Sequence, residues 1–218
     1  MVVEKAAMVL TVPTPKREPN TLVQRLERFL DRSGRAPRLT VVHRLDRETS
    51  GLLVFARDRR SGEDLIAQFR EHTPERMYHA LVRGRLPLDE GTFDTQLLTG
   101  KSLTRYSTRE QGVGERAVTH YRVETRLDDA CLVAVRLETG RRNQIRAHFA
   151  EAGHPVLGDR RYRVESARHP RWPHARLALH AGVLGFRHPL THEQLRFEAP
   201  LPREFAAFLR GSTRPGGA

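Results

Sequence analysis

The segment 43–51, HRLDRETSG, is the first stretch of the chain whose residue types could do chemistry. Within it, the carboxylate of Asp46 stands between Arg44 and Arg47. The apolar run LLVFA follows directly after the segment. A carboxylate at the edge of a core needs a cationic partner, and a lone carboxylate among basic groups can act as a nucleophile. The alternative is a structural Asp–Arg pair that holds the loop and does no chemistry, and position alone favours this alternative.

A second candidate lies in LETGRRNQIRAH, residues 137–148. We expect a strand to end at Leu137 and a helix to begin after the Thr-Gly turn, so that Arg142 and Arg146 share a face if both are helical. Arginines at a helix N-terminus attract anions, although an exposed basic helix face would give the same pattern. Because Arg146 follows the core position Ile145, we expect it at the boundary of the buried stripe, where it could pair with an internal acid.

Tyr78 is the third candidate, in the alternating segment MYHALVRG. A tyrosine in such a strand is usually a packing residue. Its ring could also stack on a base, and its hydroxyl could exchange a proton.

Other chemistries have weaker support. Histidines are frequent but lack an H-E-x-x-H pair, and Cys131 is the only cysteine, so we expect surface histidines and no metal site. The histidines considered are His43, His148, His154, His169, His174, His180, His188 and His192. No Walker loop, dinucleotide fingerprint or G-x-S-x-G elbow occurs, so we expect no cofactor.

Charge and composition restrict the partner. The chain of 218 residues has 38 Lys and Arg against 26 Asp and Glu, a formal net charge of +12. Nearly all basic residues are arginines, which favour bidentate phosphate contacts, so we predict a polyanion partner such as nucleic acid. General enrichment in arginine would explain the same numbers. No run approaches the roughly 18 apolar residues of a membrane span, and the N-terminus is a poor secretory signal, so we expect a cytoplasmic protein.

The elements that must position these residues follow from periodicity. We predict helices over 21–34, 61–72, 143–153 and 202–211. Strands are predicted over 52–56, 77–84, 117–125, 131–138 and 176–186, the last of them interrupted by Gly182. The first helix should have a Thr21–Gln24 capping box and Gly34 as its stop, with Leu22, Leu26, Phe29 and Leu30 on one face. Ser61 should cap the second helix. Residues 84–116 and 154–176 should be surface loops. The predicted class is α+β, with a mixed, mainly antiparallel sheet flanked by helices and loops.

The motifs together resemble those of the RluA-type RNA pseudouridine synthases. HRLDRETSGLLVFAR resembles the family signature H-R-L-D-x-x-T-S-G-L-L, and LETGRRNQIRAH resembles its T-G-R-x-H-Q-I-R motif. ERMYHALVRG, GERAVTHYRV, GHPVLGDRRY and LHAGVLGFRHP resemble further segments in the family order, and VVEKAAMVLTVPTP is similar to the family's opening. The resemblance covers nearly the whole chain and implies the pseudouridine synthase fold.

The resemblance implies isomerisation of uridine to pseudouridine in ribosomal or transfer RNA, without metal or cofactor. Asp46 would be the essential aspartate, acting either as a nucleophile or as a base in a glycal route. Arg146 would pair with Asp46, and Tyr78 would stack on the target base. Arg44 would fill the gap left by the flipped uridine, and Leu184 would form an apolar wall. His43, Arg47 and Arg142 complete the expected substrate-binding set.

Two departures from the family pattern are visible. Asn143 stands where the family usually has histidine, and we expect it to cap the helix and donate hydrogen bonds. The opening has Ala6 and Ala7 where the family has Pro-Ala. We expect a single catalytic domain over 1–218 without a separate N-terminal RNA-binding module, a flexible tail at 211–218, and a monomer. The competing hypotheses are a catalytically silent RNA-binding protein on this scaffold and a phosphoryl-transfer or nuclease enzyme, which would need clustered carboxylates for a metal.

Overall fold

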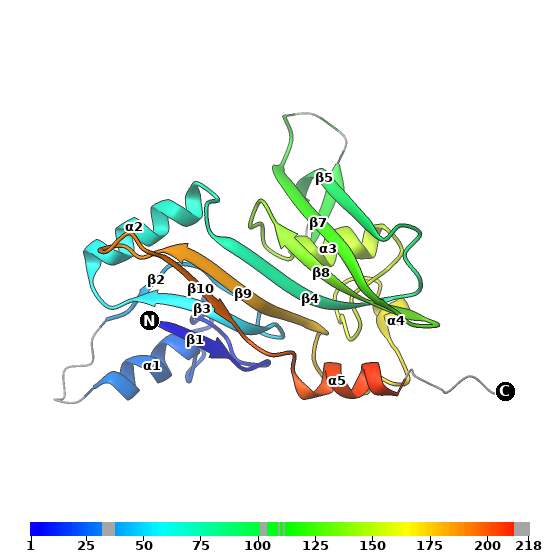
Figure 1. Ribbon diagram of the computed structural model, residues 1–218, viewed down its shortest axis with the longest axis horizontal. Helices are drawn as coiled ribbons and strands as arrows, with labels where there is room; N and C mark the ends of the chain where they lie inside the picture. The colour runs from blue at the N-terminus through cyan, green and yellow to red at the C-terminus, as the bar shows by residue number, and fades with distance from the viewer. Residues whose placement is uncertain (32–37, 101–103, 109, 111, 212–218) are drawn as a thin grey trace. The chain divides into compact units, whose positions relative to one another are not determined.

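The chain folds into two compact units. The computed structural model describes residues 1–31, 38–100, 104–108, 110 and 112–211. Unit 1 comprises Met1–Arg76 and Ala181–Ala199, and unit 2 comprises Met77–His180 and Pro200–Ala218. The chain passes between the units inside strands β4 (Glu75–Arg83) and β9 (Leu179–Arg187), which are labelled in Figure 1. The single catalytic domain over 1–218 stays a prediction, and the predicted tail lies, apart from Gly211, outside the described residues.

The strands of unit 1 centre on β3 (Ser50–Ala56). β1 (Val2–Lys5) and β2 (Thr40–Val41) pair with it in antiparallel register, and β10 (Gln194–Glu198) pairs with β9 in the same sense. Every residue of β3 is buried, as its unbroken apolar run predicts. β9 is a neighbour of β3 and runs without a break through Gly182, where the sequence predicts an interruption.

Two helices belong to unit 1. α1 (Leu22–Leu30) begins as predicted, with the Gln24 side chain accepting from the Thr21 backbone N–H at 3.0 Å. Of the predicted apolar face, Leu22, Leu26 and Leu30 are partly buried, whereas Phe29 is 80% exposed. Val23, which the prediction did not assign to this face, is the buried residue of the helix. Gly34 lies outside the described residues.

α2 (Arg59–Arg70) packs on β3 and begins two residues earlier than predicted. The prediction that Ser61 caps this helix is wrong. Asp58 is the N-cap, and its carboxylate accepts from the Ser61 N–H at 2.8 Å. The core of unit 1 joins α2, β3 and β9. Its buried members are Leu52, Val54, Ala56, Leu65, Leu184 and Phe186.

Unit 2 is built on antiparallel pairs in the order β4, β8 (Ala130–Leu137), β7 (Glu115–Arg126), β5 (Glu90–Thr99) and β6 (Arg105–Thr108). β4, β7 and β8 confirm the predicted strands. The surface loop predicted over 84–116 is wrong, because it contains β5, β6 and the start of β7. β5 is mostly polar, and its residues alternate between exposed and partly buried, so it lacks a strong apolar signal.

Three helices belong to unit 2. α3 (Gln144–Glu151) packs against β5 and β7 through a cluster of Leu97, Ala117, Ala147, Ala150 and Tyr162. α4 (Val164–Ala167) is the one helix described in the predicted loop 154–176, and α5 (Arg203–Arg210) follows Pro202. The described helices and mainly antiparallel strands confirm the α+β class, and none of these helices is long and apolar enough to cross a membrane.

Candidate active site

Asp46 lies in the loop that joins β2 to β3 in unit 1. A turn holds its backbone, since the Asp46 carbonyl accepts from the Thr49 N–H at 3.2 Å. The Asp46 side chain is half-buried, whereas Arg44 and Arg47 are exposed. The loop therefore presents a carboxylate at the protein surface with a guanidinium on either side in sequence.

Two residues far earlier in the chain anchor this loop. The hydroxyl of Thr11 donates to the Leu45 carbonyl at 2.9 Å and accepts from the Leu45 N–H at 3.3 Å. Lys5, at the end of β1, is fully buried, and its Nζ donates to the Arg47 carbonyl at 3.2 Å and to two carbonyls of its own segment. A buried ammonium is tolerated only when its donors are satisfied, so Lys5 ties the loop firmly to β1.

His43 anchors the front of the loop. Its Nε2 accepts from the Val54 N–H at 3.2 Å, and its ring stacks on Phe69 of α2 with a centroid distance of 4.3 Å. Burial, together with the nearby Arg76 guanidinium, lowers the pKa of His43 to about 3, so the imidazole is neutral at physiological pH. Its predicted part in substrate binding stays a prediction, and its observed contacts hold the loop against β3 and α2.

Gly51 anchors the rear of the loop against β9. Its backbone angle φ is +114°, a value that residues with a side chain rarely adopt. A Cβ at this position would lie 2.2 Å from the carbonyl oxygen of Ala181, so only glycine allows the two backbones to approach this closely. Leu184, three residues further along β9, is 2% exposed in the unit 1 core, and its role as a pocket wall stays a prediction.

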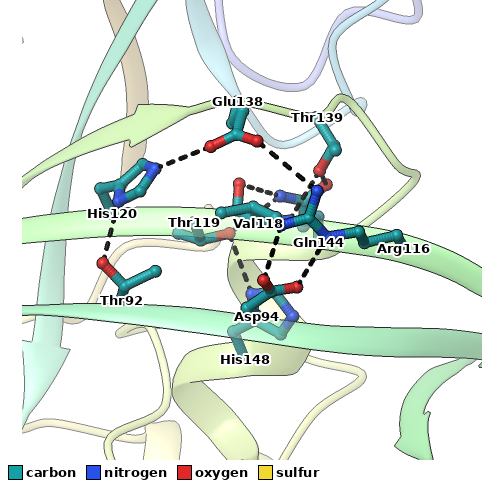
Figure 2. A network of polar contacts seen from close by, with 10 residues as sticks. All are labelled: Thr92, Asp94, Arg116, Val118, Thr119, His120, Glu138, Thr139, Gln144 and His148. Carbon is teal, nitrogen blue, oxygen red and sulfur yellow. Dashed lines mark hydrogen bonds and ion pairs between the residues drawn. The ribbon is translucent and has the colours of Figure 1, made fainter.

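In unit 2, Gln144 docks the N-terminus of α3 onto β7. Its Nε2 donates to the Val118 carbonyl and to the Thr119 hydroxyl, each at 2.9 Å. Its Oε1 accepts from the Thr139 hydroxyl at 2.8 Å and from the Arg141 N–H at 2.9 Å. Figure 2 shows Gln144 with Val118, Thr119 and Thr139. The single amide of Gln144 thus uses both its donors and its acceptor to fix the helix.

His148, one turn further along α3, attaches the middle of the helix to the sheet. Its ring nitrogens lie 2.9 Å from the Thr119 hydroxyl and 3.0 Å from the Thr95 hydroxyl. Burial lowers the pKa of His148 to about 4, and the Asp94 carboxylate opposes this shift only in part.

His148, His169 and His180 are all buried, so the prediction of surface histidines is wrong for these three.

This double attachment positions Arg146, which α3 carries between Gln144 and His148. Arg146 is 5% exposed, and its Nε and Nη2 each donate to a different oxygen of Asp159 at 2.8 Å. The Asp159 side chain is fully buried. The prediction that Arg146 pairs with an internal acid is confirmed, and the acid observed in unit 2 is Asp159.

Two further side chains surround the Arg146 guanidinium. The Tyr162 ring lies beneath the guanidinium, and Cζ of Arg146 is 5.4 Å from the centroid of this ring. Asn143 places Oδ1 3.5 Å from Nη1 of Arg146 and donates from Nδ2 to the Tyr162 hydroxyl at 3.4 Å. The expected hydrogen-bond donation by Asn143 is confirmed. Asn143 also occupies the N-cap position, and its carbonyl accepts from the Ala147 N–H at 2.9 Å, but its backbone is left-handed, at φ 55°, and its side chain caps no backbone N–H.

The remaining predicted residues of unit 2 lie on different elements. Tyr78 is 9% exposed and lies on β4, opposite Val135 of β8. Arg142 is exposed and precedes α3, so it is not helical and the condition for sharing a helical face with Arg146 is not met. Asp46 belongs to unit 1, and its pairing with Arg146 and its alignment with Tyr78 stay predictions.

Sequence reasoning missed Lys5, Gln144 and Asp159 as residues that hold the site. Lys5 and Asp159 lie in motifs quoted above, VVEKAAMVLTVPTP and GHPVLGDRRY, without an assigned role. The signal available in the sequence is that both charged residues stand beside apolar residues. A charged side chain in such a place needs a partner if it is buried.

One pocket of unit 2, of about 580 Å³, lies beside His148 and contains none of the predicted site residues. Phe93, Asp94, Thr95, Gln96, Ser107, Thr108, His148, Glu151 and Ala152 line it. Asp94 is bound by the fork of Arg116, and Glu151 accepts from the Ser107 N–H at 2.7 Å. Its acids are thus already engaged in holding β5, β6, β7 and α3 together.

Comparisons with known proteins point to one family. A family model described as RNA pseudouridylate synthase matches residues 1–151. The chain is 38% identical over 219 residues to an uncharacterized RNA pseudouridine synthase, YlyB, of Bacillus subtilis (strain 168), covering 99% of this chain and 71% of that protein. It is 39% identical over 213 residues to the ribosomal large subunit pseudouridine synthase D of Zymomonas mobilis, covering 94% and 67%.

A solved structure, human RNA pseudouridylate synthase domain containing 4, has the same fold. It superimposes with a TM-score of 0.77 at 21% identity, covering 96% of this chain and 88% of that one.

Proposed function

Because the chain belongs to the RNA pseudouridylate synthase family and is an isomerase of RNA uridine, we propose that Asp46 carries the reaction and that the substrate is ribosomal or transfer RNA. Large-subunit ribosomal RNA is the first choice, since relatives from Zymomonas mobilis and Neisseria meningitidis are named as ribosomal large subunit pseudouridine synthases. The same choice supports a cytoplasmic location, where ribosomal RNA is modified and assembled.

The reaction is an isomerisation and needs no co-reactant. The bond between uracil N1 and ribose C1′ breaks, the base rotates while bound, and a bond from C5 to C1′ forms. The proton on C5 leaves, and N1 takes up a proton. In this scheme the Asp46 carboxylate either attacks the sugar or removes a ribose proton, and both routes require it to be ionised and fixed.

The observation that carries the proposal is the immobilised loop 43–51. Its backbone is tied to β1 through Lys5, to β3 through His43 and to β9 through Gly51. A loop that only balanced charge would need none of these attachments. Fixing a reacting group in place removes much of the entropy cost of the chemical step, which is what a catalytic carboxylate requires.

The other roles in the proposed site follow the family resemblance. We assign Tyr78 to stacking on the target base and Arg146 to stabilising the ionised carboxylate of Asp46. The exposed Arg44 would enter the RNA stack when the uridine is flipped out, and Arg47 and Arg142, which are also exposed, would contact the phosphate backbone.

A tritium-release assay tests the role of Asp46. RNA labelled at uridine C5 should lose tritium when it is incubated with the protein, and Asp46→Asn should lower the rate at least about 100-fold, since a positioned acid or base contributes that much or more. Glu48→Gln is the matched control, two residues away in the same turn, and should retain most of the activity. Equal rates for Asp46→Asn and the unaltered chain would exclude Asp46 as the catalytic group.

The target is identified by comparing pseudouridine maps of total RNA from cells with and without the gene. One or a few ribosomal sites should lose the modification. If every site stays modified while the protein still binds RNA, the chain is a silent RNA-binding protein on this scaffold.

A further inference from the structure

We propose that Asp159 is a positioning residue of this enzyme, which fixes the guanidinium plane of Arg146 in the orientation that the reaction requires. The inference rests on the proposed function of Arg146. Asp159 and Arg146 lie 13 residues apart, the first in an irregular segment and the second in α3.

The geometry is that of a two-point clamp. Nε and Nη2 of Arg146 point to separate oxygens of Asp159, both at 2.8 Å, so two parallel hydrogen bonds fix the rotation as well as the position of the planar group. A single hydrogen bond would leave the guanidinium free to turn about its axis. The clamp thus sets the direction in which the remaining N–H groups of Arg146 point.

Burial makes the clamp necessary. Arg146 is 5% exposed and Asp159 is 2% exposed, so neither charge has much water around it. A buried guanidinium is strongly destabilising unless a well-placed carboxylate offsets its desolvation. Replacing Asp159 with the isosteric asparagine keeps the volume but removes the charge and one of the two acceptors.

The same carboxylate builds the rest of the surroundings of Arg146. Oδ1 of Asp159 also accepts from the backbone N–H groups of Arg161, at 2.8 Å, and Tyr162, at 3.0 Å. These bonds turn the chain so that the Tyr162 ring lies under the guanidinium. The Tyr162 hydroxyl accepts from the Arg105 N–H at 2.7 Å, which holds the ring in place. Asp159 therefore acts on Arg146 directly and through Tyr162.

A double-mutant cycle separates positioning from general structural support. The single-turnover rate is measured on labelled RNA for Asp159→Asn, Arg146→Met and the double variant. Asp159→Asn should lower the rate about 100-fold, the loss expected when a catalytic group is displaced by about 1 Å, with RNA affinity within about threefold. In the Arg146→Met background, Asp159→Asn should cost almost nothing further, because its effect passes through Arg146. Additive losses would overturn the proposal.

The matched control removes another partly buried Arg–acid pair of unit 2. Glu204→Gln breaks the contact with Nη1 of Arg176, at 3.4 Å, and should leave the rate unchanged. A comparable loss in this control would mean that any weakened ion pair slows the enzyme, which would also overturn the proposal.

A spectroscopic measurement shows whether Asp159 holds Arg146, even if Asp159→Asn does not fold or the chain releases no tritium. In ¹H–¹⁵N spectra of arginine side chains, the Nε–H signal that disappears in Arg146→Lys should exchange slowly with solvent in the unaltered protein. Rapid exchange would show that Asp159 does not hold Arg146. Absence of tritium release would count against the proposed function alone, so the two failures are distinguishable.

Discussion

At the scale of single residues, two imidazoles are held uncharged by their surroundings. His43 packs on Phe69 and accepts a backbone N–H from β3, and His148 lies between two threonine hydroxyls of the unit 2 sheet. Desolvation lowers the pKa of His43 to about 3 and that of His148 to about 4. Both residues must take up a proton when the protein unfolds in mild acid, so both couple stability to pH.

His148 gives a testable pH dependence. Its folded pKa lies below the unfolded value near 6.5, so the unfolded chain binds more protons between pH 6.5 and 4 and stability falls as the pH falls through this window. The loss attributable to His148 should be roughly 3 kcal/mol by pH 4, from about 1.4 kcal/mol for each pH unit.

The measurement is urea unfolding at several pH values for the unaltered chain and for His148→Gln. The variant should lose less stability between pH 6.5 and 4. His174→Gln, at an exposed position, is the control and should follow the unaltered chain. Parallel curves for all three proteins would contradict the prediction.

Part of the surroundings of Arg146 could be predicted from the sequence. That Arg146 pairs with a buried acid follows from its place beside Ile145, and the structure confirms it. That the acid is Asp159 did not follow, because an irregular segment without periodicity separates the two residues. Asn143 occupies the expected N-cap position of α3, but its left-handed backbone directs the side chain toward Tyr162 and Arg146.

At the scale of elements, close approach between β3 and β9 fixes the end of the loop that carries Asp46. Gly51 and Ala181 meet backbone to backbone, and Lys5 of β1 and His43 secure the rest of the loop. The loop therefore depends on three strands that come from the start, middle and end of unit 1.

Gly51→Ala should disrupt this arrangement. Its Cβ would need to occupy space 2.2 Å from the Ala181 carbonyl oxygen, in a backbone conformation that itself costs alanine about 1–2 kcal/mol. We expect the free energy of unfolding to fall by at least about 3 kcal/mol in total, which is more than the backbone strain alone would cost. Tritium release should fall as well.

Gly153→Ala is the matched control for that substitution. Gly153 also has a positive φ, of +84°, but nothing lies within 4 Å of the position that the alanine methyl group would take, so this variant should cost only the strain. Thermal or urea unfolding of both variants gives the comparison. Equal losses would show that contact with β9 is not what requires glycine at position 51.

Prediction of elements succeeded where apolar patterning was strong. β3, β4, β7 and β8 follow from their apolar residues, and α3 follows from its buried face. β5 was missed because its side chains are mostly polar, and its strand is stabilised by pairing with β7 and by contact with α3. The exposure of Phe29 did not follow from the sequence, because the periodicity of a single helix does not say how much of its apolar face a neighbour covers.

At the scale of the whole molecule, the net charge of +12 determines how the enzyme meets RNA. Each phosphate neutralised by an arginine releases counterions, so affinity must fall steeply as salt rises. Charge of this kind brings RNA to the protein without selecting a sequence, and selection of the target uridine is left to RNA shape and to the site residues.

Arg47→Gln tests whether the exposed arginine beside Asp46 contributes to this attraction. RNA affinity should weaken, and the slope of log affinity against log salt should become shallower by about one. Fluorescence anisotropy over roughly 50–200 mM salt measures the slope. Arg59→Gln removes an exposed arginine already paired with Glu63 on α2 and should leave the slope unchanged. Identical slopes for the two variants would remove Arg47 from the RNA contact set.

The division of the chain between the two units has a consequence for its biosynthesis. Unit 1 needs Leu184 and Phe186 for its core, and unit 2 needs Phe205 of α5 against Trp172. Both contributions leave the ribosome late, after the loop that carries Asp46 and the helix α3 that carries Arg146. A nascent chain cannot complete either unit in the order of its synthesis, so the enzyme should become active only after translation has passed α5, and a truncated product should remain unfolded and open to proteolysis.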